Sequence, residues 1–305
     1  MRQEAYFCTV KELDELGKNN IPRQLISHTH LIYSSPATLA FNSPGAEGFG
    51  VKRAGLAVPD SVMLIVSPGC CGRNTSVLSS MRAYQDRFYY LLMDETDIVT
   101  GRHLKKIPKA VAEICEGLKK KPSVVMICIT CVDALLGTDM ERVCHKAEEY
   151  AGVPVRPCYM YALTREGRKP PMVHVRQSVY SLLEPKKKKG NVVNLLGYFS
   201  PLTDDCELYD LLHGAGVKTI HEISRCKDYA QYQTMSEANF NLVLHPEARF
   251  AAEDFHDRLK IPYIELRRLY QIDKIASQYR AFGAALGVTV SYTHLRAHET
   301  DQYLV

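Results

Sequence analysis

The sequence predicts an α/β fold built of parallel sheets that helices cover on both faces. Short runs rich in β-branched residues are apolar almost throughout, which is typical of strands buried on both faces. These runs alternate with stretches of helical periodicity, and such alternation is typical of βαβ units. The strand candidates are residues 61–67, 88–93, 123–129, 191–197, 217–222, 240–245 and 262–265.

Helical stretches separate these strands, and one break divides the series. The predicted helices lie near residues 75–86, 104–120, 132–150, 204–213, 248–259 and 272–286. At residues 184–190 a proline, four consecutive lysines and a glycine can neither continue a helix nor pack in a core. We therefore predict two doubly wound, Rossmann-like domains, 1–185 and 190–288.

The last stretch, residues 289–305, departs from this pattern. It has no clear period, and it resembles the translated read-through of a sequencing adapter. We predict that it is a non-native tail and that the true chain continued beyond about residue 289. His294 and His298 are therefore excluded from the candidate site.

Length, charge and composition limit the class of protein. A chain of 305 residues is long enough for about two domains. The net charge of +4 is small, and the only dense basic run is in the predicted linker, which argues against nucleic-acid binding. No apolar run reaches the ~18 residues that a membrane helix needs, and the N-terminus does not read as a signal peptide. We predict a cytoplasmic protein that binds neither nucleic acid nor membrane.

Ten cysteines are many for a cytoplasmic chain, in which disulfides are rare. Cys70 and Cys71 follow the first predicted strand, and Cys128 and Cys131 close the third. Ligands of open α/β sheets bind at the carboxyl ends of the strands, so we expect these loops to form one site. Thiolates suit iron–sulfur clusters, zinc and copper(I), and the sequence predicts a cluster or redox site there.

Other interpretations of these cysteines stay open. One alternative is that they are unreactive buried thiols, the role expected of Cys115 and Cys144 inside helical stretches. Cys128 and Cys131 also have the spacing of a thioredoxin-like dithiol, which leaves the other loop unexplained. Zinc favours two well-spaced pairs, and adjacent cysteines cannot readily chelate one ion together.

Three motifs in order resemble the component 1 superfamily of nitrogenase and its relatives. Residues 68–72, Pro-Gly-Cys-Cys-Gly, resemble its Gly-Pro-x-Gly-Cys loop. Residues 94–101 resemble its acidic Asp-Ile-Val-Phe-Gly segment, and residues 130–139 resemble its Thr-Cys-x-x-x-Leu-Ile-Gly-Asp-Asp motif. The resemblance extends more loosely to about residue 288.

The resemblance implies a cofactor and partners. It places Cys71 and Cys131 at ligand positions of an iron–sulfur cluster, of the 4Fe–4S type. Family members have three Rossmann-like domains, so the third is missing here. Two homologous chains pair, as homo- or hetero-oligomers, and an ATP-dependent iron–sulfur reductase delivers electrons. The implied function is an oxidoreductase subunit that reduces a bound substrate; the alternatives are a non-catalytic scaffold for metallocluster assembly and a thiol-disulfide oxidoreductase.

The sequence departs from the family pattern at one ligand. The family's earliest cluster cysteine would fall near residues 44–46, where this chain has none. Cys8, Cys70 and Cys128 are the substitutes that the chain offers, with Cys158 as an outside candidate.

Two further positions carry expectations. His245 stands near the position where nitrogenase has a cysteine that binds its catalytic cofactor, and we expect a structural hydrogen-bonding role, with a substrate or metal role as the alternative. Asp94, Glu95 and Asp97 are expected to cap the helix that follows, with tuning of the cluster or cation binding as the alternative.

Overall fold

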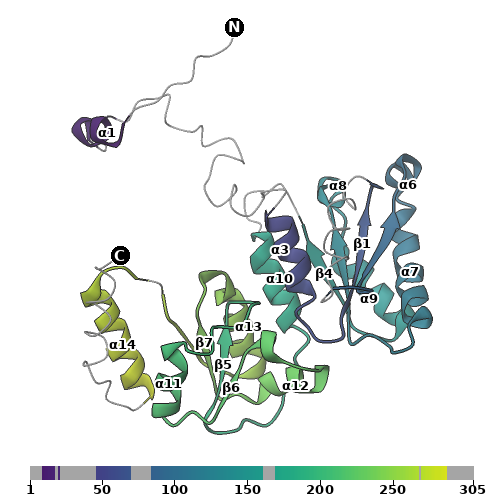
Figure 1. The fold of residues 1–305 in the computed structure, drawn as a ribbon. Coiled ribbons are helices and arrows are strands. Elements are labelled where there is room, and N and C mark those ends of the chain that lie inside the picture. Colours follow the sequence, from purple (N-terminus) through teal and green to yellow (C-terminus); the bar gives the residue numbers. More distant parts are fainter. Residues whose placement is uncertain are drawn as a thin grey trace.

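The computed structural model of the chain describes residues 9–17, 20, 46–69, 84–160, 169–267 and 269–286. They form two parallel sheets of four strands each, with flanking helices (Figure 1). The predicted α/β fold of doubly wound parallel sheets is confirmed. Cys8, Cys70, Cys71, most of the predicted helix 75–86 and the tail 289–305 lie outside the described residues. In the described part of the chain, no helix has the length and apolar character needed to span a bilayer.

The first sheet has the strand order β2-β1-β3-β4. Its strands are β1 (Val62–Ser67), β2 (Phe88–Leu92), β3 (Val125–Ile129) and β4 (Val155–Tyr159). The helices of this half are α1 (Val10–Leu16), α3 (Ala46–Gly55), α6 (Glu95–Thr100), α7 (His103–Gly117), α8 (Cys131–Leu136), α9 (Met140–Ala151) and α10 (Pro171–Tyr180). Helices α3 and α10 cover one face of the sheet, and α7 and α9 cover the other.

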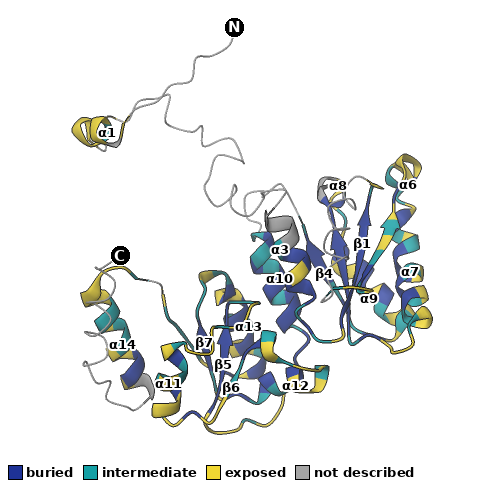
Figure 2. Cartoon of the chain, viewed as in Figure 1, coloured by how far each residue is buried: buried dark blue, intermediate teal, exposed yellow. Residues whose placement is uncertain are grey.

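Burial on both faces explains the apolar run of β1. Met63 and Ile65 lie in the apolar cluster under α3 and α10, whereas Leu64 and Val66 lie in the cluster under α7 and α9. All six residues of the strand are buried (Figure 2). A strand with no solvated face does not need to alternate polar and apolar residues. The prediction of this strand rested on the continuous apolar run that results.

The second sheet repeats the arrangement with the order β6-β5-β7-β8. Its strands are β5 (Val192–Leu196), β6 (Thr219–His221), β7 (Phe240–Val243) and β8 (Tyr263–Glu265). Its helices are α11 (Glu207–Gly214), α12 (Tyr229–Gln233), α13 (Arg249–Leu259) and α14 (Ile272–Leu286), with short 3-10 turns at Ile223–Arg225, Thr234–Glu237 and Pro246–Ala248. In each sheet the first strand of the chain has a neighbour on both sides: β2 and β3 flank β1, and β6 and β7 flank β5. The strand order therefore reverses at β1 and at β5.

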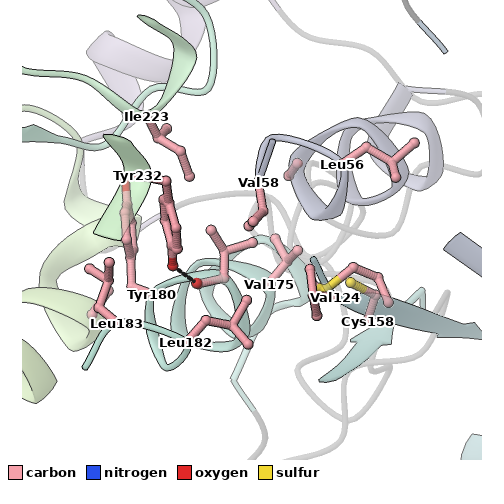
Figure 3. Packing of buried hydrophobic residues seen from close by; sticks show 14 of the residues in the cluster. Leu56, Val58, Val124, Cys158, Val175, Tyr180, Leu182, Leu183, Ile223 and Tyr232 are labelled. Carbon is pink, nitrogen blue, oxygen red and sulfur yellow. Dashed lines mark hydrogen bonds between the residues drawn. The ribbon is translucent and has the colours of Figure 1, made fainter. Parts of the chain in front are cut away.

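Helix α10 packs against both halves of the molecule. Its Val175 and Tyr180 lie in one apolar cluster that also holds Val58 from the first half and Tyr232 from the second (Figure 3). The rings of Tyr180 and Phe255 meet edge to face, with centroids 5.3 Å apart. The two sheets therefore share one hydrophobic core.

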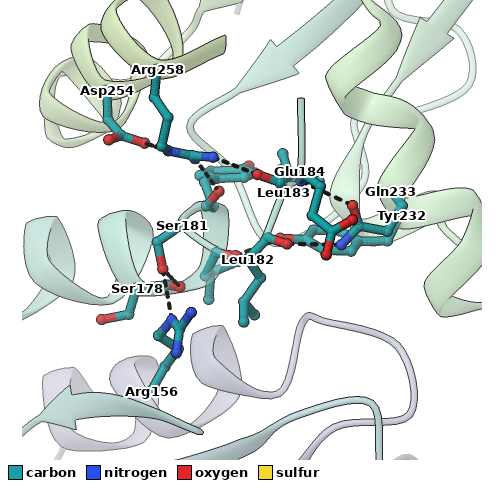
Figure 4. A network of polar contacts seen from close by, with 12 residues as sticks. Arg156, Ser178, Ser181, Leu182, Leu183, Glu184, Tyr232, Gln233, Asp254 and Arg258 are labelled. Carbon is teal, nitrogen blue, oxygen red and sulfur yellow. Dashed lines mark hydrogen bonds and ion pairs between the residues drawn. The ribbon is translucent and has the colours of Figure 1, made fainter. Parts of the chain in front are cut away.

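Polar contacts hold the end of α10 from both sides. Arg258 of α13 donates to the carbonyl oxygens of Tyr180, at 3.0 Å, and of Leu183 (Figure 4). From the first sheet, Arg156 of β4 donates to the hydroxyl of Ser181 at 3.1 Å. Because buried carbonyl groups are costly to leave unpaired, these contacts tie the segment after α10 to both sheets.

The lysine-rich segment 184–190 lies between α10 and β5 in the chain. Lys188 donates to the carbonyl of Ser236 at 2.6 Å, whereas Lys186 and Lys187 are exposed. The division into domains 1–185 and 190–288 stays a prediction.

One predicted helix, residues 132–150, is in fact two helices, α8 and α9. Gly137 between them has a φ of 69°, a left-handed conformation that ends a helix and favours glycine. Asp139 then caps α9 by accepting a hydrogen bond from the N–H of Arg142 at 3.1 Å. The apolar periodicity continues across the break, which is why the pattern alone did not reveal it.

Strand β4 and the helices α1, α3, α10 and α12 are absent from the predicted series of strands and helices. β4 contains Pro157 and lies at an edge of its sheet, where a missing N–H is tolerated. α10 begins with a proline and carries buried apolar residues on several sides, so it lacks a clear polar face.

Candidate functional site

The carboxyl ends of β1 and β3 lie side by side in the first sheet. The chain order places β2 on one side of β1 and β3 on the other, so the strand order reverses here. Open α/β sheets bind ligands at such a point. The register pairs Val66 with Ile129, and the next residues, Ser67 and Thr130, therefore stand at the same level. Cys131 follows as the first residue of α8.

Of the four predicted cluster ligands, the structure describes Cys128 and the backbone of Cys131. Cys70 and Cys71 follow β1 and lie outside the described residues. Cys131 begins α8, and Cys128 lies inside β3, fully buried. Among the residues that the structure describes, no three histidine, cysteine or acidic side chains are grouped to hold a metal ion. Cluster binding by these four cysteines stays a prediction.

Cys158 of β4 stands at the same register as Cys128, and both lie in the apolar cluster under α3 and α10. A Cβ atom at Gly55 of α3 would come within 2.8 Å of Cys158 Sγ, so the helix approaches this thiol very closely. Burial raises the pKa of Cys158 well above its usual value. Cys158 therefore behaves as a small hydrophobic residue, which argues against its being a further ligand.

Three buried oxygen atoms at this edge have no hydrogen-bond partner among the described residues. They are Ser67 Oγ, Thr130 Oγ1 and Asp133 Oδ2. Each of these residues is at most 1% exposed. Buried polar groups in proteins are almost always paired, so three unpartnered oxygens indicate an edge built against a polar or charged group. Thiol ligands for iron and hydroxyl donors for sulfur fit the predicted cluster.

A buried histidine anchors the helix that begins at Cys131. His103 Nδ1 lies 3.0 Å from the carbonyl oxygen of Asp97, and because a carbonyl only accepts, this nitrogen donates. His103 Nε2 lies 2.9 Å from Asp133 Oδ1, and the hydroxyl of Thr138 donates to the same oxygen at 3.1 Å. The pair therefore joins the start of α7 to α8.

Of the three acidic residues expected to cap a helix, Asp94 is the N-cap of α6, whereas Glu95 and Asp97 lie in the first turn of that helix. Asp94 accepts a hydrogen bond from the N–H of Asp97 at 2.7 Å and so caps α6. The carboxylate of Asp97 is buried between Lys106, at 2.6 Å, and Arg102, at 2.7 Å. Hydrogen bonds from these two cations lower the pKa of Asp97 to about 2.

Asp97 gives stability a defined pH dependence. Since its pKa is depressed in the folded protein, its ion pairs stabilise the fold fully above the ordinary pKa of 3.8 and lose their effect as pH falls towards about 2. We expect Asp97→Asn to lower Tm by several degrees near neutral pH and to differ progressively less from the unsubstituted protein in acid. Asp257→Asn, on an exposed residue, is the control. A difference in Tm that stays constant with pH would contradict this account.

Most residues of this network have no local signal in the sequence. His103 and Asp133 are 30 positions apart, and their contact arises only from the packing of α7 against the sheet edge. Ser67 had a weak signal, because it is a polar residue that ends an otherwise apolar run. Thr130 was part of the recognised motif, though without a role of its own.

The corresponding edge of the second sheet holds His245. It follows β7, and its Nδ1 accepts from the N–H of Glu247 at 3.3 Å. Its ring meets that of Tyr198 edge to face, with centroids 5.7 Å apart. Gly197 has a φ of 139°, and a Cβ there would come within 2.8 Å of the backbone nitrogen of His245. The contacts agree with the structural hydrogen-bonding role expected of His245.

A cavity of about 570 Å³ lies between the two halves. Its walls come from α3, the turn before β1 and the segments that follow β5 and β6. It is lined by the cations Arg53, Arg87 and Lys227 and by one carboxylate, that of Asp60, which Lys120 already pairs at 2.8 Å. The cavity therefore has a positive charge and the size of a site for a small organic molecule.

Most of the chain is similar to proteins of one known family. The family model "Nitrogenase component 1 type Oxidoreductase" matches residues 47–304, and so it runs into the segment predicted to be a foreign tail. Among solved structures, "Nitrogenase Cp1 at pH 6.5" is similar with a TM-score of 0.59 and 18% identity, over 79% of this chain and 57% of that one. At this identity the similarity concerns the fold alone.

Curated relatives carry the name "Nitrogenase iron-molybdenum cofactor biosynthesis protein NifE". The protein from Nostoc sp. is 27% identical over 239 residues, which is 75% of this chain and 49% of the relative. That from Klebsiella pneumoniae is 26% identical over 266 residues, which is 80% of this chain and 58% of the relative. The chain thus spans about half the length of these relatives. Since the family model covers most of its residues, the chain belongs to the nitrogenase component 1 type oxidoreductase family.

Proposed function

We propose that this chain is a cytoplasmic, cluster-binding oxidoreductase subunit that accepts electrons from an ATP-dependent iron–sulfur reductase and passes them to a bound substrate. The observation that carries the proposal is the edge of the first sheet, where β1 and β3 end side by side and three buried oxygens have no partner among the described residues. Membership of the family supports the oxidoreductase class.

In this proposal Cys71 and Cys131 are the principal ligands of a cluster of the 4Fe–4S type, and Cys70 and Cys128 are the candidates for the remaining position. A bound cluster supplies one-electron chemistry. The chain itself supplies the thiolates, a buried edge and hydrogen bonds, which together set the reduction potential. The anchoring of α8 by His103 and Asp133 holds the Cys131 backbone in place.

A partner chain and a substrate cleft complete the proposed function. A second homologous chain pairs with this one, as homo- or hetero-oligomer. The cavity between the two halves is the proposed substrate cleft, and its three cations favour an anionic substrate.

A second candidate function is a non-catalytic scaffold on which a metallocluster is assembled for another enzyme. The observation that favours it is the name of the relatives from Nostoc and Klebsiella, which are cofactor biosynthesis proteins. A scaffold needs the same cysteines but must release what it holds.

One experiment separates the candidates. The full chain is purified without oxygen, and iron, acid-labile sulfide and electron paramagnetic resonance are measured after addition of an ATP-dependent iron–sulfur reductase with Mg-ATP. The protein is then incubated with an apo-ferredoxin. An electron carrier becomes reduced only with ATP and retains its iron, whereas a scaffold transfers iron to the apo-ferredoxin and is not reduced. A colourless, iron-free protein with a reducible Cys128–Cys131 bond would contradict both.

A further inference from the structure

Two of the three unpartnered oxygens, those of Ser67 and Thr130, are hydroxyl groups. They end β1 and follow β3 at the same level of the sheet, and neighbouring strands are about 4.8 Å apart. Thr130 immediately precedes Cys131, and Ser67 lies four positions before Cys71. Each predicted principal ligand therefore has one unpartnered buried hydroxyl near it in the chain.

These hydroxyls are not explained by the local backbone. Thr130 stands just before α8, where a hydroxyl commonly caps a helix, but Thr130 Oγ1 has no hydrogen-bond partner among the described residues. In residues 46–160, as far as described, the buried side-chain oxygens without a partner are those at this edge. Leaving a buried hydroxyl unpaired is costly, so two neighbouring ones indicate that a ligand completes them.

We infer that the hydroxyls of Ser67 and Thr130 donate hydrogen bonds to sulfur atoms of the cluster held by Cys71 and Cys131 and thereby raise its reduction potential. This inference rests on the proposed function. A hydroxyl has one proton to donate, and the sulfur atoms of thiolate and sulfide are acceptors. Reduction adds negative charge to those sulfurs, so a donor stabilises the reduced form more than the oxidised form.

The test uses variants that remove a hydroxyl and preserve shape. We expect Thr130→Val and Ser67→Ala to keep the iron and sulfide content of the unsubstituted protein. Each is expected to lower the equilibrium constant for one-electron reduction about tenfold, which is a shift of about 59 mV to more negative potential. Thr130→Ser, which keeps the donor, is expected to retain the original potential. Redox titration followed by electron paramagnetic resonance measures all three.

Thermal unfolding of the cluster-free protein provides the second readout. Without the cluster the Thr130 hydroxyl has no partner, so Thr130→Val is expected to leave Tm unchanged or to raise it. The matched control is Ser178→Ala, whose hydroxyl is buried but donates to the carbonyl of Pro157 at 2.7 Å. That change is expected to lower Tm and to leave the potential unchanged.

The possible failures are distinguishable. If the unsubstituted protein binds no iron, the proposed function fails. If it binds iron and the potentials of Thr130→Val and Ser67→Ala equal that of the unsubstituted protein, the function stands and the inference about the hydroxyls is wrong. A lowered Tm of cluster-free Thr130→Val together with an unchanged potential would assign the hydroxyl to the fold, for example through a buried water, and would also overturn the inference.

Discussion

Alanine in place of Cys71 or Cys131 is expected to remove most of the iron and acid-labile sulfide from the anaerobically purified protein. Each change deletes a principal ligand, and a cluster held from two loops is not retained by one of them. Iron and sulfide per chain are measured together with Tm of the cluster-free protein. An unchanged Tm with lost iron identifies a ligand, because a cysteine that only packs in the core would lower Tm instead.

Cys128 and Cys158 provide a matched pair for the remaining ligand. They lie at the same register of β3 and β4 and are both fully buried in one apolar cluster. Alanine at either position removes a similar amount of packing. Loss of iron in Cys128→Ala but not in Cys158→Ala would assign Cys128 as a ligand, and equal iron in both would assign it to the core and leave Cys70 as the candidate. If Cys71→Ala and Cys131→Ala both retained full iron, the proposed site would be wrong.

Replacing Arg176 by methionine is expected to destabilise the protein by about 3–5 kcal/mol, the usual cost of removing one partner from a buried ion pair. Arg176 of α10 donates to Glu247 Oε2 at 2.7 Å and twice to the carbonyl oxygen of Gly197, at 3.1 and 2.6 Å. It thus joins α10 to the carboxyl ends of β5 and β7. Urea unfolding near neutral pH measures the loss.

The pH dependence identifies the cause. Burial raises the pKa of Glu247, and Arg176 opposes that shift. Without Arg176 the pKa rises further, so the ionised carboxylate destabilises the variant at neutral pH and its protonation relieves the penalty in mild acid. The difference in unfolding free energy between variant and parent is therefore expected to shrink as pH falls.

Two further variants complete this test. Arg176→Met combined with Glu247→Gln is expected to recover part of the lost stability, because no unpaired charge stays buried. Arg249→Met removes an exposed arginine from ion pairs with Glu253 and Glu265 and is expected to cost far less stability, because exposed ion pairs contribute little. An equal cost for Arg176→Met and Arg249→Met would refute a special role for the buried pair.

Local pattern was sufficient for the strands that form the centre of each sheet. β1, β3 and β5 are buried on both faces, and this burial leaves a continuous apolar run that can be read from the sequence. The same apolar run also located Cys131, because the run ends at Ile129 and Cys131 follows it in the chain. The acidic helix cap at Asp94 was equally local, since a cap involves residues only three positions apart.

The edge strand β4, the helix α10 and the contacts between distant side chains could be recognised only in the tertiary structure. β4 carries a proline and an arginine, which are tolerated only because it lies at an edge, and α10 has no polar face because both sheets bury it. The sequence by itself determined the class of fold, the positions of the central strands along the chain and the place of Cys131 just after β3. Only the packing of distant segments decided that His103 meets Asp133, that Arg176 meets Glu247 and that the hydroxyls of Ser67 and Thr130 are left without partners among the described residues. Such contacts join positions up to 71 residues apart, and no periodicity along the chain records them.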